Sequence, residues 1–152
     1  MIDFTKIEVH TMQLSDLEEI QDCLQTDFDD FWTFEIFKGE LVNTTSSYLV
    51  LRYEGEIVCF GGIKIILDEA NIMDIVTKKK KRNQGFARIL LNELITIAKE
   101  ENCSTMTLEV REHNLPAIHL YEQFDFQEVG RRKHYYRNGD TAILMTLPFT
   151  NL

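Results

Sequence analysis

Residues 82–88, Arg-Asn-Gln-Gly-Phe-Ala-Arg, have the residue types and spacing of an anion-binding turn. Strand-like residues precede this segment and a helical apolar pattern follows it, so the turn would lie where a helix begins. The first backbone amides of a helix lack internal partners, and the helix dipole adds partial positive charge there. Gly85 and Ala87 leave room for phosphate oxygens, while Arg82 and Arg88 add charged donors. The segment predicts a pyrophosphate site, with an ordinary surface turn as the alternative.

The stretch Lys78 to Arg82 places five of the 16 basic residues directly before this turn. A run of like charge is commonly just a solvated loop. Beside an anion-binding turn, it could also attract a polyphosphate ligand from a distance.

The chain as a whole is acidic, because 25 acidic residues outnumber 16 basic ones and give a net charge of −9. This balance argues against direct nucleic-acid binding and favours a cationic partner, such as an amine. We also expect no membrane partner, since no apolar run approaches the roughly 20 residues of a membrane span. Met1 to Thr11 lack the basic and apolar segments of a signal peptide.

The cysteines and histidines predict no metal site. Cys23, Cys59 and Cys103 are far apart, with no Cys-x-x-Cys pair, and the four histidines are scattered. Unpaired cysteines of this kind indicate a reducing, cytoplasmic location. Cys103 is a conceivable acyl carrier, but its place beyond a helical segment favours a structural thiol.

The elements that must position the turn follow from apolar periodicity, and no linker or repeat divides the 152 residues, so we expect one domain over 1–152. Helices are expected over 15–25, with a Ser15-x-x-Glu18 capping box, and from Thr33 through Phe37. The aromatic residues before the second helix, Phe28, Phe31 and Trp32, are expected in the core. Strands over 48–52 and 57–66 would form a hairpin around Glu54-Gly55, and Gly61-Gly62 suggests a bulge or a close backbone approach.

The second half predicts a strand over 71–76, a helix from Phe86 to Ala98 and a strand over 105–110. Such a crossover makes the two strands parallel, with room for a ligand groove between them. Asn114 would cap a helix to Phe124, and strands over 127–136 and 142–148 would pair around Asn138-Gly139. The predicted class is α+β with a mixed sheet.

Several motifs together resemble the GNAT N-acetyltransferase superfamily. They are Arg82-x-x-Gly85-x-Ala87, Leu108-Glu109-Val110-Arg111, Asn114, Ala117-Ile118-x-Leu120-Tyr121-Glu122 and Phe126-x-x-Val129-Gly130-Arg131-Arg132. Within it, Leu67 to Ala70, Arg131-Arg132-x-x-Tyr135-Tyr136 and Ala142 to Met145 resemble bacterial ribosomal-protein alanine N-acetyltransferases of the RimI type. The likeness covers about residues 48–148. It implies a single N-acetyltransferase domain with helices on both faces of the sheet and an acetyl-CoA groove between two splayed parallel strands.

The resemblance also implies which residues hold acetyl-CoA, with no metal. The pantetheine chain would pair with the strand at Ile75, Val76 and Thr77, and a backbone amide near Val76 could polarise the thioester carbonyl. The other cofactor positions are Arg82, Asn83, Gln84, Gly85, Phe86, Ala87, Arg88 and Asn114.

Acetyl transfer to an amine needs a base, because an α-ammonium has a pKa of about 7.7–8.0. Glu109 lies in the apolar strand Met106 to Val110, where burial would raise a carboxylate's pKa towards neutrality. The family's general base matches Glu109. The alternative is an exposed charge or an ion pair with Arg111.

Departure of the thiolate needs an acid, and a phenol with a pKa of about 10 is a feasible donor to it. Tyr121 lies seven positions after Asn114, two helical turns on, and it matches the family's general acid. A buried structural aromatic residue is the alternative.

The resulting hypothesis is acetylation of a protein N-terminus, plausibly the alanine of the eighteenth small-subunit ribosomal protein. The alternatives are acetylation of a small amine, such as a polyamine or antibiotic, and a non-catalytic acetyl-CoA-binding module. Two departures from the family pattern stand out. Asp125 replaces the glycine usual after the second crossover helix, and Asp140-Thr141 replaces an acidic pair.

Overall fold

A computed structural model describes residues 2–28 and 33–149 of the protein. Phe31 and Trp32, expected in the core, lie outside these ranges. Seven strands form a sheet in the order β1-β2-β3-β4-β5-β7-β6. The strands are β1 (Ile7–Thr11), β2 (Ser46–Tyr53), β3 (Glu56–Ile66), β4 (Glu69–Thr77), β5 (Thr105–Arg111), β6 (Gln127–Arg132) and β7 (Ala142–Pro148). The helices are α1 (Leu14–Glu19), α2 (Phe34–Leu41), α3 (Phe86–Glu100) and α4 (Leu115–Gln123).

The mixed sheet confirms the predicted α+β class, because β4 pairs with β5 in parallel while β1–β2, β2–β3, β5–β7 and β6–β7 are antiparallel. The chain divides into two compact units. Unit 1 comprises Met1–Lys64 and Met73–Thr96, and unit 2 comprises Ile65–Ile72 and Ile97–Leu152. Each unit is described by itself, and the single domain over 1–152 stays a prediction.

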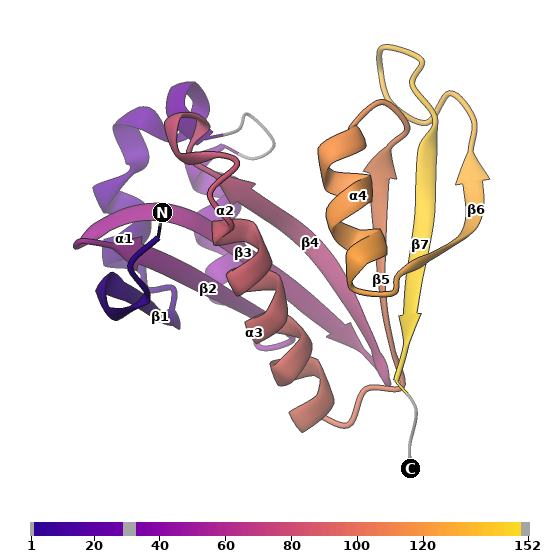
Figure 1. The fold of residues 1–152 in the computed structure, drawn as a ribbon, viewed down its shortest axis with the longest axis horizontal. Coiled ribbons are helices and arrows are strands. Elements are labelled where there is room, and N and C mark those ends of the chain that lie inside the picture. The colour runs from indigo at the N-terminus through magenta and orange to yellow at the C-terminus, as the bar shows by residue number, and fades with distance from the viewer. Residues whose placement is uncertain (1, 29–32, 150–152) are drawn as a thin grey trace. The chain divides into compact units, whose positions relative to one another are not determined.

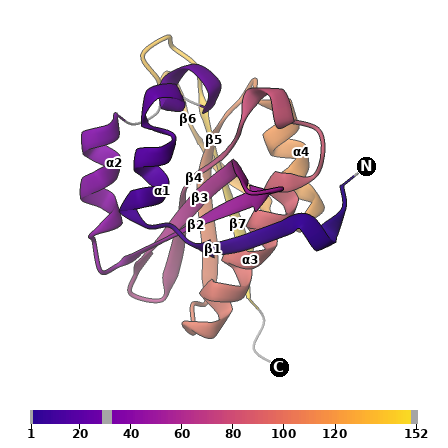
Figure 2. The ribbon, with the colours of Figure 1, turned by 90° about the vertical axis from the view of Figure 1, so that its left-hand side faces the viewer.

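In unit 1, helices lie on both faces of the strands. Figure 1 and Figure 2 show α1 and α2 on one face of β2 and β3, and the first part of α3 on the other. Aromatic rings fill the core on the α2 side, where the Phe60 centroid lies 5.3 Å from both Phe28 and Phe37. The predicted apolar face of α3 is confirmed, since Phe86, Leu90, Leu91, Leu94, Ile95 and Ala98 are all buried.

The first helix differs from the prediction in its bounds and in its cap. Its N-cap is Gln13, whose backbone N–H donates to Asp16 Oδ2 at 2.7 Å, and not Ser15. The α-helix ends at Glu19, and the chain continues through a 3₁₀ turn (Gln21–Cys23) and a π turn (Leu24–Phe28). The α geometry stops because Ile20 leaves the helical region, at φ −105° and ψ 7°. The strand β1 before it was not predicted.

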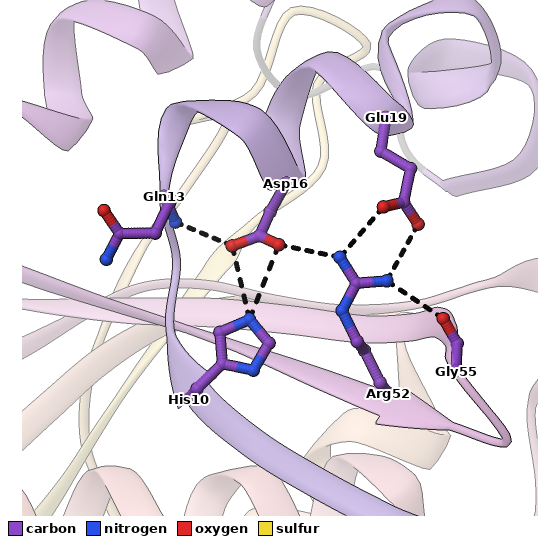
Figure 3. Close-up of polar contacts among 6 residues, drawn as sticks. All are labelled: His10, Gln13, Asp16, Glu19, Arg52 and Gly55. Carbon is purple, nitrogen blue, oxygen red and sulfur yellow. Dashed lines mark hydrogen bonds and ion pairs between the residues drawn. The ribbon is translucent and has the colours of Figure 1, made fainter.

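Asp16 also ties α1 to the sheet. Figure 3 shows the Arg52 guanidinium between Asp16 and Glu19, with His10 on the other side of Asp16. The Asp16 side chain is the one buried charged group among the described residues.

In unit 2, the first part of β4 pairs with β5 through Glu69–Asn71 and Thr105–Thr107. Figure 1 and Figure 2 show α4 beside β5, on one face of this part of the sheet. Buried and accessible residues alternate along β5, so Met106, Leu108 and Val110 face the core while Glu109 and Arg111 are exposed. The strand β6 ends at Arg132, four residues before the predicted end, because the chain enters a turn with His134 at φ 56°.

The turn predictions are confirmed where backbone angles test them. Glu54 and Gly55 have φ values of 53° and 83°, as a two-residue hairpin turn requires, and Gly139 has φ 89°. Gly61 and Gly62 mark a close backbone approach. A Cβ on Gly61 would lie 2.6 Å from the Asp74 carbonyl oxygen, and a Cβ on Gly62 would lie 2.3 Å from the Tyr48 ring.

None of the helices in the described ranges has the length and apolar character that crossing a lipid bilayer requires.

Candidate active site

The predicted anion-binding turn of unit 1 connects β4 to α3 and is open to solvent. Arg82, Asn83, Gln84 and Gly85 are all exposed. Gly85 has φ 93°, a conformation that side chains disfavour, and Asn83 also has a positive φ of 64°. The first backbone bond of α3 runs from the Ile89 N–H to the Gly85 carbonyl at 3.3 Å, so the amides of the preceding first turn have no helical acceptor. The turn therefore has the form that an anion site needs.

Two contacts anchor this turn to the body of unit 1. The Phe86 ring is buried and lies 5.3 Å from the Tyr53 ring, which fixes the first residue of α3 against β2. At the other end, the Lys78 N–H donates to the Val58 carbonyl at 2.8 Å. The Arg82 Nε donates to the Thr77 carbonyl at 3.4 Å, so this side chain folds back to the end of β4.

Part of the basic run before the turn is paired within the protein. Lys78 Nζ lies 3.1 Å from Glu56 Oε1, and Lys81 Nζ lies 3.9 Å from Glu56 Oε2. The Glu56 carboxylate thus balances part of the positive charge of Lys78 and Lys81. These pairs are compatible both with a solvated loop and with a segment that attracts a polyphosphate ligand.

The three β4 positions expected to hold pantetheine differ in their surroundings. The Ile75 N–H donates to Asp74 Oδ1 at 3.0 Å, while Val76 is buried. Thr77 Oγ1 donates to Cys59 Sγ at 3.5 Å.

In unit 2, Glu109 does not occupy the buried environment that the sequence predicts. Its carboxylate is exposed on β5, and its Oε1 lies 3.7 Å from Arg132 Nη1. The burial expectation was wrong because the alternation of β5 turns Leu108 and Val110 to the core and Glu109 away from it. The alternative of an ion pair with Arg111 is corrected too, since the cation is Arg132 on β6.

Arg111 instead holds the segment between β6 and β7. Its guanidinium carbon lies 3.8 Å from the Tyr136 ring centroid, and its Nη1 lies 3.2 Å from Asn138 Oδ1 and 3.5 Å from Asp140 Oδ2. Burial raises the pKa of Tyr136, and the negative charge of Glu109 adds to this effect. Arg132 and Tyr136 have no predicted role in the sequence beyond their place in the Arg131-Arg132-x-x-Tyr135-Tyr136 motif, which is the signal that could have indicated these contacts.

Asn114 and Tyr121 occupy opposite ends of α4. The Asn114 Oδ1 accepts the Ala117 N–H at 3.3 Å, which confirms the predicted N-cap. Tyr121 is buried, and its ring lies 5.6 Å from that of Phe126. Tyr121 is thus enclosed beside Phe126, whereas Glu109 lies on the exposed face of β5.

A family model described as "Acetyltransferase (GNAT) family" matches residues 10–126. The chain belongs to the GNAT acetyltransferase family. It is an N-acetyltransferase, and the family uses acetyl-CoA.

Relatives of this GNAT enzyme include ribosomal-protein acetyltransferases. A Bacillus subtilis (strain 168) protein, named provisionally as a ribosomal protein bS18-alanine N-acetyltransferase, is 35% identical over 143 residues, which span 93% of this chain and 95% of the relative. The Escherichia coli (strain K12) enzyme named for the same activity is 36% identical over 103 residues, 66% of this chain and 70% of its own.

The fold of this GNAT enzyme matches that of a solved relative. The crystal structure of the ribosomal-protein-S18-alanine N-acetyltransferase from Escherichia coli aligns with a TM-score of 0.86 and 28% identity, over 96% of both chains. The RimI-type resemblance is therefore confirmed at the level of family and fold.

The thiols of this GNAT enzyme lie in environments that disfavour their reactive form. Burial raises the pKa of Cys59 to about 12. Burial also raises the pKa of Cys103, and the charges of Asp68 and Glu101 add to the shift. Since the thiolate is the nucleophile, these shifts support the structural role over that of an acyl carrier.

One group of potential metal ligands is brought together in unit 2. Atoms of Glu112, His113 and Asp140 lie within 4.8 Å of one another. Both carboxylates have other partners, since Glu112 Oε1 accepts the Thr141 N–H at 3.3 Å and Asp140 Oδ2 accepts from Asn138 Nδ2 at 2.9 Å. The absence of a metal stays a prediction.

Proposed function

We propose that this GNAT enzyme transfers the acetyl group of acetyl-CoA to the α-amine of a protein N-terminus, in particular the N-terminal alanine of ribosomal protein bS18. The observation that carries this proposal is the 35% identity to the Bacillus subtilis relative, because it extends over 93% of this chain and 95% of that protein. A likeness of this length includes the acceptor-binding half as well as the cofactor-binding half. The net charge of −9 also suits a basic acceptor.

For the cofactor, we propose that the turn of unit 1 binds the pyrophosphate. The exposed amides at the start of α3 supply hydrogen-bond donors, and the guanidinium groups of Arg82 and Arg88 add charge. The adjacent β4 residues Ile75, Val76 and Thr77 would pair with pantetheine. A backbone amide near Val76 would polarise the thioester carbonyl. Asn114 is the cofactor position proposed in unit 2.

For the chemistry, we propose that Glu109 takes a proton from the α-ammonium, directly or through water, which frees the nitrogen lone pair. Acetyl-CoA supplies the electrophilic thioester carbonyl carbon. The new C–N bond forms there as the C–S bond breaks, and Tyr121 donates its phenolic proton to the departing thiolate. The second proton lost from the nitrogen returns the Tyr121 phenolate to its neutral form, directly or through water. Both roles match those of the family, and catalysis requires that the thioester reach the two side chains.

The experiment is a comparison of acceptors. The enzyme is incubated with acetyl-CoA and a peptide carrying the first residues of bS18, and the product is weighed and sequenced by mass spectrometry. Two matched acceptors serve as controls: the same peptide with its α-amine blocked, and a polyamine. We expect one acetyl group on the N-terminal alanine and none on the blocked peptide. Acetylation confined to lysine side chains or to the polyamine would contradict the proposal.

A further inference from the structure

The cation beside Glu109 comes from a different strand, and the register of unit 2 explains how it reaches the carboxylate. Across the antiparallel strands, Glu109 pairs with Leu144, which pairs with Gly130. In the next row on the same face, Arg111 pairs with Ala142, which pairs with Arg132. Residues directly opposite one another share a face of the sheet, so the side chains of Glu109, Arg111 and Arg132 leave the same face. All three residues are exposed.

Two of the residues on this face are small, namely Gly130 in the Glu109 row and Ala142 between the two arginines. The larger Leu144, opposite Glu109, leans over Gly130, where its Cδ1 would lie 3.4 Å from an added Cβ. The Arg132 side chain extends back towards Glu109, where Nη1 and Oε1 lie 3.7 Å apart.

The other charged and titratable groups around Glu109 have different partners. Arg111, on the same strand, stacks on Tyr136 and bonds to Asn138 and Asp140. Tyr136, from the segment after β6, is neutral below its raised pKa. Arg132 also approaches the Tyr135 ring, at 5.4 Å from its guanidinium carbon to the centroid. Of these groups, Arg132 is the cation in an ion pair with Glu109.

We infer that Arg132 is a positioning residue for acetyl transfer: its guanidinium orients the Glu109 carboxylate towards the acceptor amine. This inference rests on the proposed role of Glu109. The physical reason is that an ion pair with a neighbouring strand restricts the orientations open to the carboxylate. Side chains with exposed fractions of 54% and 32% are partly screened by water, so the effect is moderate.

The test is the kcat and KM of Arg132→Gln, measured with whichever amine the wild-type enzyme acetylates best. Loss of the cation leaves the Glu109 carboxylate less well oriented, so kcat falls by up to about fivefold while the KM for the amine changes little. Arg132→Lys restores part of this loss. The Kd for acetyl-CoA is expected to stay at the wild-type value.

The matched control is Arg131→Gln. Arg131 is the neighbouring arginine on β6, it is exposed, and it pairs with Glu128 at 3.1 Å. Arg131 pairs with Ile143, which in turn pairs with Val110, so the Arg131 side chain lies on the face of the sheet opposite to that of Glu109 and Arg132. This variant should keep the wild-type kcat and KM. An unchanged kcat in Arg132→Gln, or an equal loss in both variants, would overturn the inference.

A double-mutant cycle separates action through Glu109 from a general structural effect. If Arg132 acts through Glu109, then Arg132→Gln causes no further loss in an enzyme that already carries Glu109→Gln. Additive losses would overturn the inference. Because any acetylated amine can report this coupling, failure of the bS18 peptide as an acceptor would count against the proposed function alone.

Discussion

Asp16 and Arg52 form an ion pair of unit 1, with 2.7 Å between Oδ1 and Nη2 and side-chain exposures of 7% and 17%. The same guanidinium bonds to both oxygens of Glu19, each at 2.9 Å, and to the Gly55 carbonyl at 2.9 Å (Figure 3). One arginine on β2 therefore joins α1 to the turn between β2 and β3. Removal of either partner would leave the other charge in a largely dry position.

The first prediction concerns this ion pair. Replacement Arg52→Met should lower the free energy of unfolding by about 2–4 kcal/mol, because the Asp16 carboxylate stays buried without its cation. Denaturant unfolding followed by circular dichroism measures the change. The control is Lys6→Met, which removes an exposed pair with Glu54 at 3.9 Å and should cost less than about 1 kcal/mol. Equal losses in the two variants would show that burial of the pair is unimportant.

The second prediction concerns the loss of folding stability at acidic pH. Burial alone would raise the pKa of Asp16, but bonds from the Gln13 amide, Arg52 and His10 outweigh it and lower the pKa. The ionised carboxylate therefore contributes stability that is complete above its unfolded value of about 3.9 and is lost as the pH falls through the folded value. Unfolding measured at a series of pH values should show a steeper decline below about pH 4 for the wild type than for Asp16→Asn. Parallel curves would contradict this account.

The third prediction tests the turn before α3. Gly85→Ala should weaken acetyl-CoA binding about tenfold, because a side chain at φ 93° costs about 1–2 kcal/mol of backbone strain. A Cβ there would meet only Ile2 Cδ1 at 3.7 Å, so a steric clash is not the cause. Calorimetric titration gives the affinity. Gly39→Ala on α2, where a Cβ meets nothing within 4 Å, is the control and should leave binding unchanged. Wild-type affinity in Gly85→Ala would argue against a cofactor role for the turn.

The fourth prediction concerns the proposed base. Glu109→Gln should lower kcat by about 10²–10⁴, the usual contribution of a positioned base, with little change in the Kd for acetyl-CoA. Steady-state kinetics and calorimetry separate the two quantities. Glu128→Gln is a suitable control, since Glu128 is an exposed glutamate of β6 that pairs with Arg131. A loss of cofactor binding equal to the loss of rate would show that Glu109 serves structure instead.

The fifth prediction concerns the end of α4. Asp125 has φ 71°, and its N–H donates to the Glu122 carbonyl at 3.0 Å, so the residue fills the left-handed position that glycine prefers. Asp125→Gly should therefore raise the free energy of unfolding by up to about 1 kcal/mol. Asp22→Gly, in a 3₁₀ turn without a positive φ, should lower it. A loss in both variants would mean that chain entropy outweighs the relief of strain at Asp125.

The elements around the proposed cofactor site could be predicted well from the sequence, because the patterns that indicate them are local. The apolar repeat from Phe86 to Ala98, the Asn114 cap and the Glu54-Gly55 turn each depend on residues a few positions apart.

The predictions that were wrong or missing concern features that depend on residues far apart in the sequence. The strand β1 has mixed polar and apolar residues, and it forms because Ile7–Thr11 pair with Leu49–Tyr53 of β2. The exposure of Glu109 depends on which face of β5 the helix α4 covers, and its pairing with Arg132 depends on a register across three strands. Local apolar neighbours in the sequence, such as Leu108 and Val110, could not show this.

The contact of Gly61 with Asp74 limits how this enzyme can be altered. Any larger residue at position 61 would push against the backbone of β4, two residues before Val76. Mutant libraries of this enzyme should therefore keep Gly61 and vary exposed positions such as Tyr135 and Asn138. Close backbone packing thus fixes the residue at position 61, whereas exposed positions can accept other side chains.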